Sequence, residues 1–372
     1  MTKAFGLLFA IVLLSAADSV RAQGVFGLGD AGEGYALVTP GREFDFPADH
    51  GAHDGYRIEW WYVTANLADD AGNRYGVQWT LFRVMMRPPD GQVDIAGPWA
   101  SPWLFIGHAA LTTAREHLAA ERFARGDVGQ AGVAAAPAFE AWIDDWRMRS
   151  TTVGSDGLAG VELEAAGDGF SYHLDLGAHG PLVLHGDSGF SRKSSGAQAS
   201  YYYSQPSFRA TGDIVIDGER HAVSGTAWMD REWSSQLLAR TQTGWDWFSL
   251  SFADGARAMM FRLRDATRGD YLSGTYVTPA GEAHALAPGD IILTPVKWKK
   301  LDAARVPVEW RVQAPSVGID VRTTPLNPDS WMDLQFPYWE GPIKLAGDRA
   351  GVGYLEMTGY DASTVGRGGG RP

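Results

Sequence analysis

Short runs of alternating apolar and polar residues fill most of the 372-residue chain, and Gly, Asp and Asn turns separate them. Runs of this length, rich in aromatic and β-branched residues, predict β-strands. The clearest examples are residues 59–67, 75–85, 201–204, 222–228, 245–252 and 258–264. Helical spacing is rare, and we expect a short helical or irregular segment only at 110–124. Many strands with few helices predict an all-β barrel or sandwich.

One short pattern occurs twice along the chain, at residues 59–83 and 246–262. Each copy has an acidic residue followed by two aromatic residues, a turn of the Asp-Gly type and then an aliphatic or aromatic run ending in Phe-Arg. Repeated patterns indicate repeated architecture. We therefore expect two β-barrels packed together, an N-terminal one at 35–228 and a C-terminal one at 229–365.

The two repeats also predict how their hairpins pair. Side chains on a strand alternate between two faces, so folding the first hairpin about its turn sets Glu59 opposite Arg83. Folding the second hairpin sets Asp246 opposite Arg262. A carboxylate on an apolar face needs a partner, and arginine can clamp it with paired hydrogen bonds. Two interpretations stay open: a structural ion pair at a barrel end, or a polar anchor in an apolar pocket.

Residues 201–204 are three tyrosines and a serine, whose side chains alternate between the two faces of a strand. Tyr201 and Tyr203 lie on one face. Phenol groups that point inward would offer hydrogen bonds to a ligand, whereas outward ones would cover a domain interface. The sequence leaves this choice open.

The segment 228–233 is the densest group of charges beside tryptophans. Trp228, Asp230 and Glu232 share one face of a strand, and Arg231 lies on the other. Two carboxylates on one side could share a proton, which would raise one pKa and suit a general acid that protonates an alkene. The alternative is a salt-bridged domain junction.

Composition narrows the partners and the compartment. The net charge of −12 argues against nucleic acid or an anionic membrane as the main partner. Residues 1–22 have a lysine, an uncharged apolar run and a small-residue cleavage site, which predicts a secretory signal peptide. With no cysteine for disulfides or a lipid anchor, we expect a soluble periplasmic or secreted protein with no membrane span after cleavage. Residues 366–372 are expected to form a loose tail.

Familiar cofactor and nucleophile motifs do not occur. The chain has neither a Gly-x-Ser-x-Gly elbow nor a phosphate-binding Gly-rich loop with Lys-Ser/Thr. His50 and His53 are close in sequence, but without a His-Glu-x-x-His pattern they favour no metal site. We predict neither a cofactor nor a metal.

Several motifs together resemble those of the AttH and carotenoid 1,2-hydratase superfamily. They lie at residues 47–87, 201–204, 225–233, 244–247, 339–342 and 353–360. The resemblance implies two packed lipocalin-like barrels. It also implies either a protein encoded beside ABC-transporter components or a hydratase that adds water to an isoprenoid or flavonoid double bond. The chain departs from the carotenoid hydratases at Arg231 and Glu232, where those enzymes carry His and Asn, and arginine cannot shuttle protons near neutral pH.

Two functions follow as hypotheses. The favoured one is an exported protein that binds a hydrophobic lipid or isoprenoid-like molecule, as an accessory to ABC-type export; the alternative is a hydro-lyase. The candidate catalytic residues are Asp230 and Glu59. The candidate ligand-binding residues are Trp61, Tyr62, Arg83, Tyr201, Tyr203, Trp228, Arg231, Glu232, Trp233, Trp245, Asp246, Trp247 and Arg262.

Overall fold

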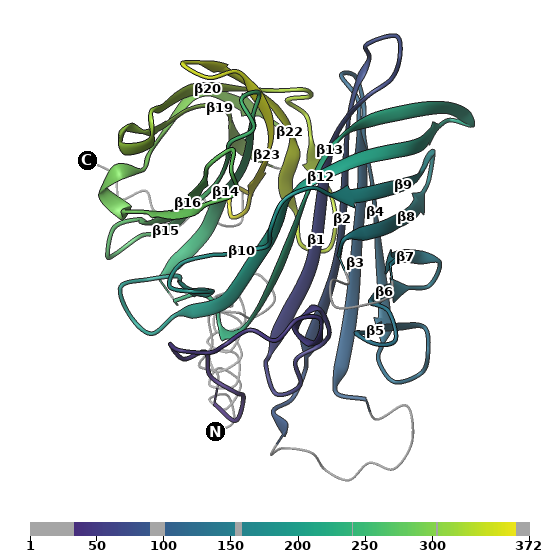
Figure 1. The fold of residues 1–372 in the computed structure, drawn as a ribbon, viewed down its shortest axis with the longest axis vertical. Coiled ribbons are helices and arrows are strands. Elements are labelled where there is room, and N and C mark those ends of the chain that lie inside the picture. The colour runs from purple at the N-terminus through teal and green to yellow at the C-terminus, as the bar shows by residue number, and fades with distance from the viewer. Residues whose placement is uncertain (1–32, 90–100, 153–157, 240, 303, 362–372) are drawn as a thin grey trace, which may run out of the picture.

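The computed structural model describes residues 33–89, 101–152, 158–239, 241–302 and 304–361. These residues form two curled antiparallel β-sheets that lie side by side (Figure 1). Within them, no helix is long and apolar enough to cross a membrane. The expected signal peptide at 1–22 and the expected tail at 366–372 lie outside the described residues.

The first sheet contains the strands from β1 to β13, in the order β4-β3-β2-β1-β13-β12-β9-β8-β7-β6-β5, with β10 and β11 also paired to β12. The strands are β1 (Ile58–Ala68), β2 (Arg74–Met85), β3 (Trp103–Thr112), β4 (His117–Arg125), β5 (Ala131–Ala134), β6 (Glu140–Ile143), β7 (Trp146–Ser150), β8 (Gly160–Gly167), β9 (Phe170–Ala178), β10 (Val183–Leu184), β11 (Phe190–Arg192), β12 (Ala199–Ile216) and β13 (Glu219–Gln236). A short 3-10 helix, η2 (Ala48–His50), precedes β1.

The second sheet follows the order β17-β16-β15-β14-β23-β22-β20-β19-β18, with β21 paired to β22. Its strands are β14 (Gln242–Phe252), β15 (Arg257–Asp265), β16 (Tyr271–Val277), β17 (Ala283–Leu286), β18 (Ile292–Lys300), β19 (Arg305–Ala314), β20 (Ile319–Pro325), β21 (Trp331–Met332), β22 (Tyr338–Gly347) and β23 (Gly351–Met357). The 3-10 helices η5 (Pro288–Asp290) and η6 (Pro315–Val317) lie in its connections. The expected all-β fold of two lipocalin-like parts is confirmed.

Both repeated hairpins have the register that the sequence predicts. Glu59 pairs with Arg83 across β1 and β2, and Asp246 pairs with Arg262 across β14 and β15. The apolar residues between these pairs also align as expected, because shifting either strand by one position would turn them out of the core.

Each sheet has an inner face that is filled with aromatic and aliphatic side chains. On the first sheet these include Trp61, Trp79 and Trp233, which are fully buried. On the second sheet they include Trp310 and Trp339, which are also fully buried. Tryptophans of this size supply much of the apolar area that holds a chain without disulfides together.

The outer face of the first sheet packs against the second sheet, and we call the layer between them the seam. The strands that contribute are β1, β2, β12 and β13 on one side and β14, β15, β22 and β23 on the other. The apolar residues of the seam are Ile58, Tyr62, Val84, Tyr202, Trp228, Leu237, Leu238, Trp247, Met259, Phe261, Leu263 and Tyr354. Because both of its faces are covered at this place, the first sheet needs buried side chains on both.

Two expectations differ from the structure. Residues 110–124 are not helical: they end β3 and form most of β4, because β3 pairs with β2 on one side and with β4 on the other. The first sheet also extends past residue 228. β13 continues to Gln236 and pairs with both β1 and β12, so the segment 229–236 belongs to the first sheet rather than the second.

Candidate functional site

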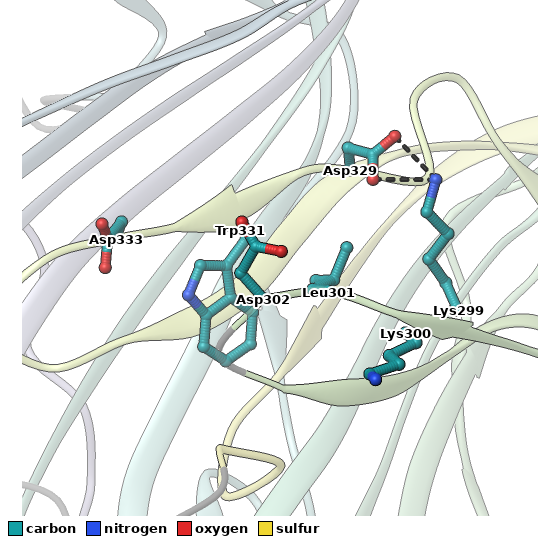
Figure 2. A pocket seen from close by; sticks show the side chains of 7 residues that line it. All are labelled: Lys299, Lys300, Leu301, Asp302, Asp329, Trp331 and Asp333. Carbon is teal, nitrogen blue, oxygen red and sulfur yellow. Dashed lines mark hydrogen bonds and ion pairs between the residues drawn. The ribbon is translucent and has the colours of Figure 1, made fainter.

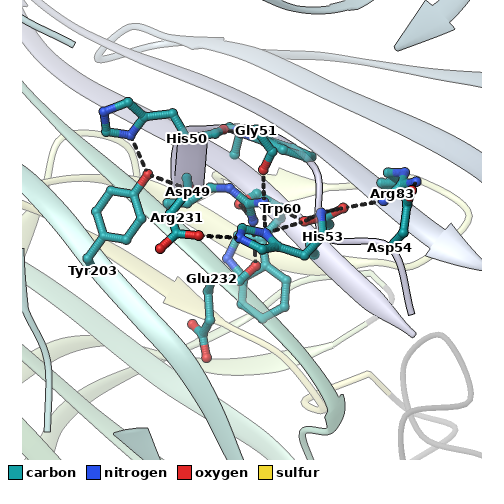
Figure 3. A network of polar contacts seen from close by, with 12 residues as sticks. Asp49, His50, Gly51, His53, Asp54, Trp60, Arg83, Tyr203, Arg231 and Glu232 are labelled. Carbon is teal, nitrogen blue, oxygen red and sulfur yellow. Dashed lines mark hydrogen bonds and ion pairs between the residues drawn. The ribbon is translucent and has the colours of Figure 1, made fainter. Parts of the chain in front are cut away.

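A buried ion network that includes His53, Arg83 and Arg231 lies on the inner face of the first sheet (Figure 3), and these three residues all contact Glu59. Arg83 donates to the Glu59 carboxylate at 2.7 Å, and Arg231 donates to the second carboxylate oxygen. His53 contacts the same oxygen at 3.2 Å. Burial alone would raise the pKa of Glu59, but Arg231, His53 and Arg83 outweigh it and hold that pKa well below its usual value. Glu59 is therefore a carboxylate, not a proton donor, at neutral pH.

The segment before β1 closes over this network. Asp49 on η2 accepts from His53 at 3.0 Å and from Arg42 at 2.5 Å. The His53 ring also stacks on Trp233, with centroids 3.8 Å apart. His50 reaches the Tyr203 hydroxyl at 2.7 Å, so both ends of the segment are fixed to the sheet (Figure 3).

The second sheet repeats the arrangement around Asp246, which is fully buried. Arg262 donates to it at 2.8 Å from Nε and lies 2.7 Å from it through Nη2, and Arg264 donates to the other oxygen at 2.8 Å. The Tyr360 hydroxyl adds a third donor at 2.8 Å. Each sheet thus encloses one carboxylate held by two arginines.

The seam holds a different kind of carboxyl group. Asp230 on β13 is 2% exposed and has no cation among its hydrogen-bond partners in the described chain. It accepts from Tyr202 at 2.7 Å, from Trp228 at 2.6 Å and from Ser204. Burial raises the pKa of Asp230 by more than these hydrogen bonds lower it, and the Glu232 charge raises it further. The pKa of Asp230 is therefore about 7.

Three more carboxyl groups lie near Asp230. Glu232 is paired with Lys193 at 2.7 Å. Glu340 and Glu356 lie opposite each other on β22 and β23. Burial, together with the charges of Asp230 and Glu232, raises the pKa of Glu356 to about 7 despite a hydrogen bond from Trp245. The structure thus places a group of acids among aromatic rings, with one cation bound to one of them.

Glu340 and Glu356 differ in their surroundings. Burial and the Glu356 charge raise the pKa of Glu340 well above its usual value, and Tyr62 donates to Glu340 at 2.5 Å. Glu356 and its partner Trp245 are only partly buried, whereas Asp230 and Glu340 are buried.

A hydrogen-bonded chain crosses the seam behind Asp230. Ser204 donates to Asp230 and lies 2.6 Å from Nε2 of His185. Nδ1 of His185 lies 2.8 Å from the Thr275 hydroxyl of the second sheet. Burial and the Lys193 charge lower the pKa of His185 to about 3, so this ring is neutral at physiological pH.

The candidate residues from the sequence fall into three separate groups. Those on the inner face of the first sheet are Glu59, Trp61, Arg83, Tyr201, Tyr203, Arg231 and Trp233. Those in or beside the seam are Tyr62, Trp228, Asp230, Glu232, Trp245 and Trp247. Asp246 and Arg262 lie inside the second sheet. The two catalytic candidates, Asp230 and Glu59, thus point to opposite faces of the same sheet.

Sequence reasoning missed Glu340, Glu356, His185 and Lys193 as members of one site. A signal was present for the two glutamates, because each is the lone acid in a largely apolar strand. No sequence pattern links them to Asp230, since they reach it only through the packing of the two sheets.

Two other places bring charged side chains together. A hollow of about 480 Å³ at the rim of the second sheet is lined by lysines, acids and Trp331, and Lys299 pairs there with Asp329 at 2.9 Å (Figure 2). On the outer surface of the first sheet, Glu162, His173 and Asp175 hold potential metal ligands within 4.8 Å of one another. They are largely exposed, and Glu162 already pairs with Arg149 at 2.5 Å, so we assign no metal to them.

Fold and site together define an all-β protein of two lipocalin-like parts with an acid cluster between them. The chain belongs to the AttH-like family, whose pattern it matches over residues 37–360.

Similar solved structures agree with this assignment. A candidate AttH from Nitrosomonas europaea is 33% identical, with a TM-score of 0.78 over 88% of this chain and 99% of that one. Kievitone hydratase from Nectria haematococca shares the fold at 15% identity, with a TM-score of 0.65 over 88% of this chain and 97% of that one. CghA, solved with Sch210972, is 12% identical, with a TM-score of 0.50 over 89% and 97%. No curated protein matches the chain.

Proposed function

We propose that this protein binds an apolar, unsaturated small molecule at the seam and protonates it from Asp230, as a hydro-lyase does. The observation that carries the proposal is the Asp230 carboxyl group, which is buried among aromatic residues and has a pKa of about 7. A carboxylic acid with this pKa holds its proton on about half of the molecules at pH 7 and still gives it up readily.

Hydration needs a proton donor and a proton acceptor. The Asp230 O–H group would protonate one carbon of the double bond, and a water oxygen would bond to the other carbon. The proton that this water loses must then go to a base. We assign that role to Glu356, because its pKa is also about 7 and its charge interacts with that of Asp230. The sum of the steps is the addition of one water, with both carboxyl groups restored by exchange with solvent.

The replacement of histidine by Arg231 does not argue against a hydratase at this site. Arg231 stands where carotenoid hydratases are expected to carry histidine, and it cannot shuttle protons. Its side chain, however, points to the inner face of the first sheet and binds Glu59. Arg231 therefore does not lie beside Asp230. Ser204 donates to Asp230 instead, and His185 contacts Ser204.

The apolar layer of the seam favours a second candidate, which is binding without chemistry. Trp228 and Trp247 pack there with ring centroids 6.4 Å apart, and aromatic side chains also line sites for isoprenoid or lipid chains. Export across a membrane, residence in the periplasm and an ABC-transporter partner stay predictions from the sequence. Kievitone hydratase shares only the fold with this chain, and the fold suits the enzyme and the carrier alike.

Mass spectrometry separates the two candidates. The purified protein is incubated in oxygen-18 water with isoprenoid and prenylated flavonoid alkenes and with any molecule that co-purifies. An enzyme gives a product heavier by one labelled water, and Asp230→Asn abolishes this product because the amide cannot donate an acidic proton.

The matched control is Asp213→Asn, the same change at an Asp whose partner is the exposed Arg220. This variant is expected to keep the activity. A bound molecule that remains unchanged with wild-type protein would favour the carrier. A water gain that persists in Asp230→Asn would refute the role of Asp230.

A further inference from the structure

A recess of about 350 Å³ opens on the inner face of the first sheet, away from the seam. Its apolar wall includes Trp103, Phe105, Val133 and Trp142, and its polar groups include Arg83. Trp103, Phe105 and Arg83 lie on β2 and β3, and Asp230 points to the other face of the same sheet. The recess is therefore separate from the acid cluster. Its volume is at the small end of ligand pockets and suits one ring system or one short chain.

Arg83 is the cation of this recess, and it is only 6% exposed. Its guanidinium lies 3.2 Å from the centroid of the Trp103 ring. One nitrogen donates to buried Glu59 at 2.7 Å, and the other donates to Asp54. The two partners differ sharply, because the Glu59 side chain is 2% exposed and the Asp54 side chain is 83% exposed. Arg83 is thus bound on its inner side by a fixed carboxylate and on its outer side by a replaceable one.

The charges of the network explain why an outer anion is needed. Buried Arg83 and Arg231 share Glu59 as their common carboxylate. Asp49 has its own cation in Arg42. One positive charge therefore remains, and Asp54 balances it from the surface. A buried guanidinium with too little counter-charge is costly, so an anion is favoured at this position.

We propose that the recess binds an apolar monocarboxylic acid, whose carboxylate replaces that of Asp54 on Arg83 while its apolar body packs against Trp142 and Phe105. Asp54 already shows the chemistry, since its carboxylate accepts from one guanidinium nitrogen of Arg83. Asp127 also lines the recess, and its charge disfavours a second negative group on the ligand. The site therefore selects a single carboxylate over a dicarboxylate.

Calorimetric titration with decanoate tests this proposal, with decanol as the uncharged probe of equal chain length and decanedioate as the doubly charged one. Wild-type protein is expected to bind decanoate and to bind the other two at least about tenfold more weakly. Asp54→Ala removes the competing carboxylate, so decanoate should bind roughly twofold to fivefold more tightly. Trp142→Ala removes part of the wall and should weaken binding about tenfold.

Two control variants distinguish binding at the recess from binding at another site and from a general loss of folding. Trp298→Ala, a tryptophan loss at an exposed position of β18, should leave decanoate binding unchanged. Asp230→Asn should also leave it unchanged, so the recess and the seam can fail independently. The proposal is overturned if decanoate does not bind, if decanol binds equally well, if Asp54→Ala does not tighten binding, or if Asp230→Asn abolishes it while Trp142→Ala does not.

Discussion

Replacing Asp230 by asparagine should stabilise this protein at neutral pH while removing its proton donor. In the folded chain the pKa of Asp230 is raised from 3.8 to about 7. Between these values the folded state holds a proton that the unfolded state has lost, so stability falls as the pH rises through this range. A shift of about three pKa units corresponds to about 4 kcal/mol once the pH exceeds 7. Asparagine carries no charge, so the variant does not lose this stability.

Urea unfolding of wild type and Asp230→Asn at several pH values between 4 and 8 measures the effect. The free-energy gap between the two proteins should be small at pH 4 and grow in favour of the variant by about 1.4 kcal/mol per pH unit up to pH 7. The amide alters the hydrogen bonds from Tyr202 and Ser204, but that cost of about 1 kcal/mol does not depend on pH. Asp213→Asn should show no such growth. A flat gap would mean that Asp230 ionises at its ordinary pKa, and the proposed acid would be lost with it.

Three further results are expected from other parts of the structure. Glu59→Gln should lower the free energy of unfolding at pH 7 by about 3–5 kcal/mol, because it leaves Arg83 and Arg231 buried without their carboxylate; a loss below about 1 kcal/mol would contradict the network. Gly76→Ala should cost about 1–3 kcal/mol in the same assay, since its Cβ would lie 2.5 Å from Pro342 of the second sheet. Tryptophan fluorescence should titrate near pH 7 as Glu356 ionises beside the Trp245 ring, and a Glu356→Gln variant that still shows this transition would assign it elsewhere.

The hairpin registers were predictable because they depend on local information. Strand alternation, a short turn and the need to pair Glu59 and Asp246 with arginines leave one register for each hairpin, and the structure has it. The same alternation separated Asp230 from Arg231 correctly. It could not tell which face would become the seam, because that depends on a second sheet far away in the chain.

The sequence could not predict which residues pack against each face of the two sheets. Asp230 is followed more than 100 residues later by Glu340 and Glu356, and only the docking of the two sheets brings them together. The alanine-rich segment 110–124 was misjudged for a related reason. Alanine has little preference for strands, and in β3 it takes the strand conformation through pairing with β2 and β4 rather than through local propensity.

Neighbouring residues of β13 show why a proton is held at the seam and not inside the first sheet. Arg231 points inward, where it neutralises Glu59 and keeps that carboxyl ionised. Asp230 points outward into an equally dry layer, where its described hydrogen-bond partners include no cation and Lys193 is bound to Glu232. A buried carboxyl group without a cation lowers its free energy by taking up a proton. The division of charge between the two faces of one strand therefore places an acid that can release its proton near pH 7 between the two sheets, where apolar side chains surround it.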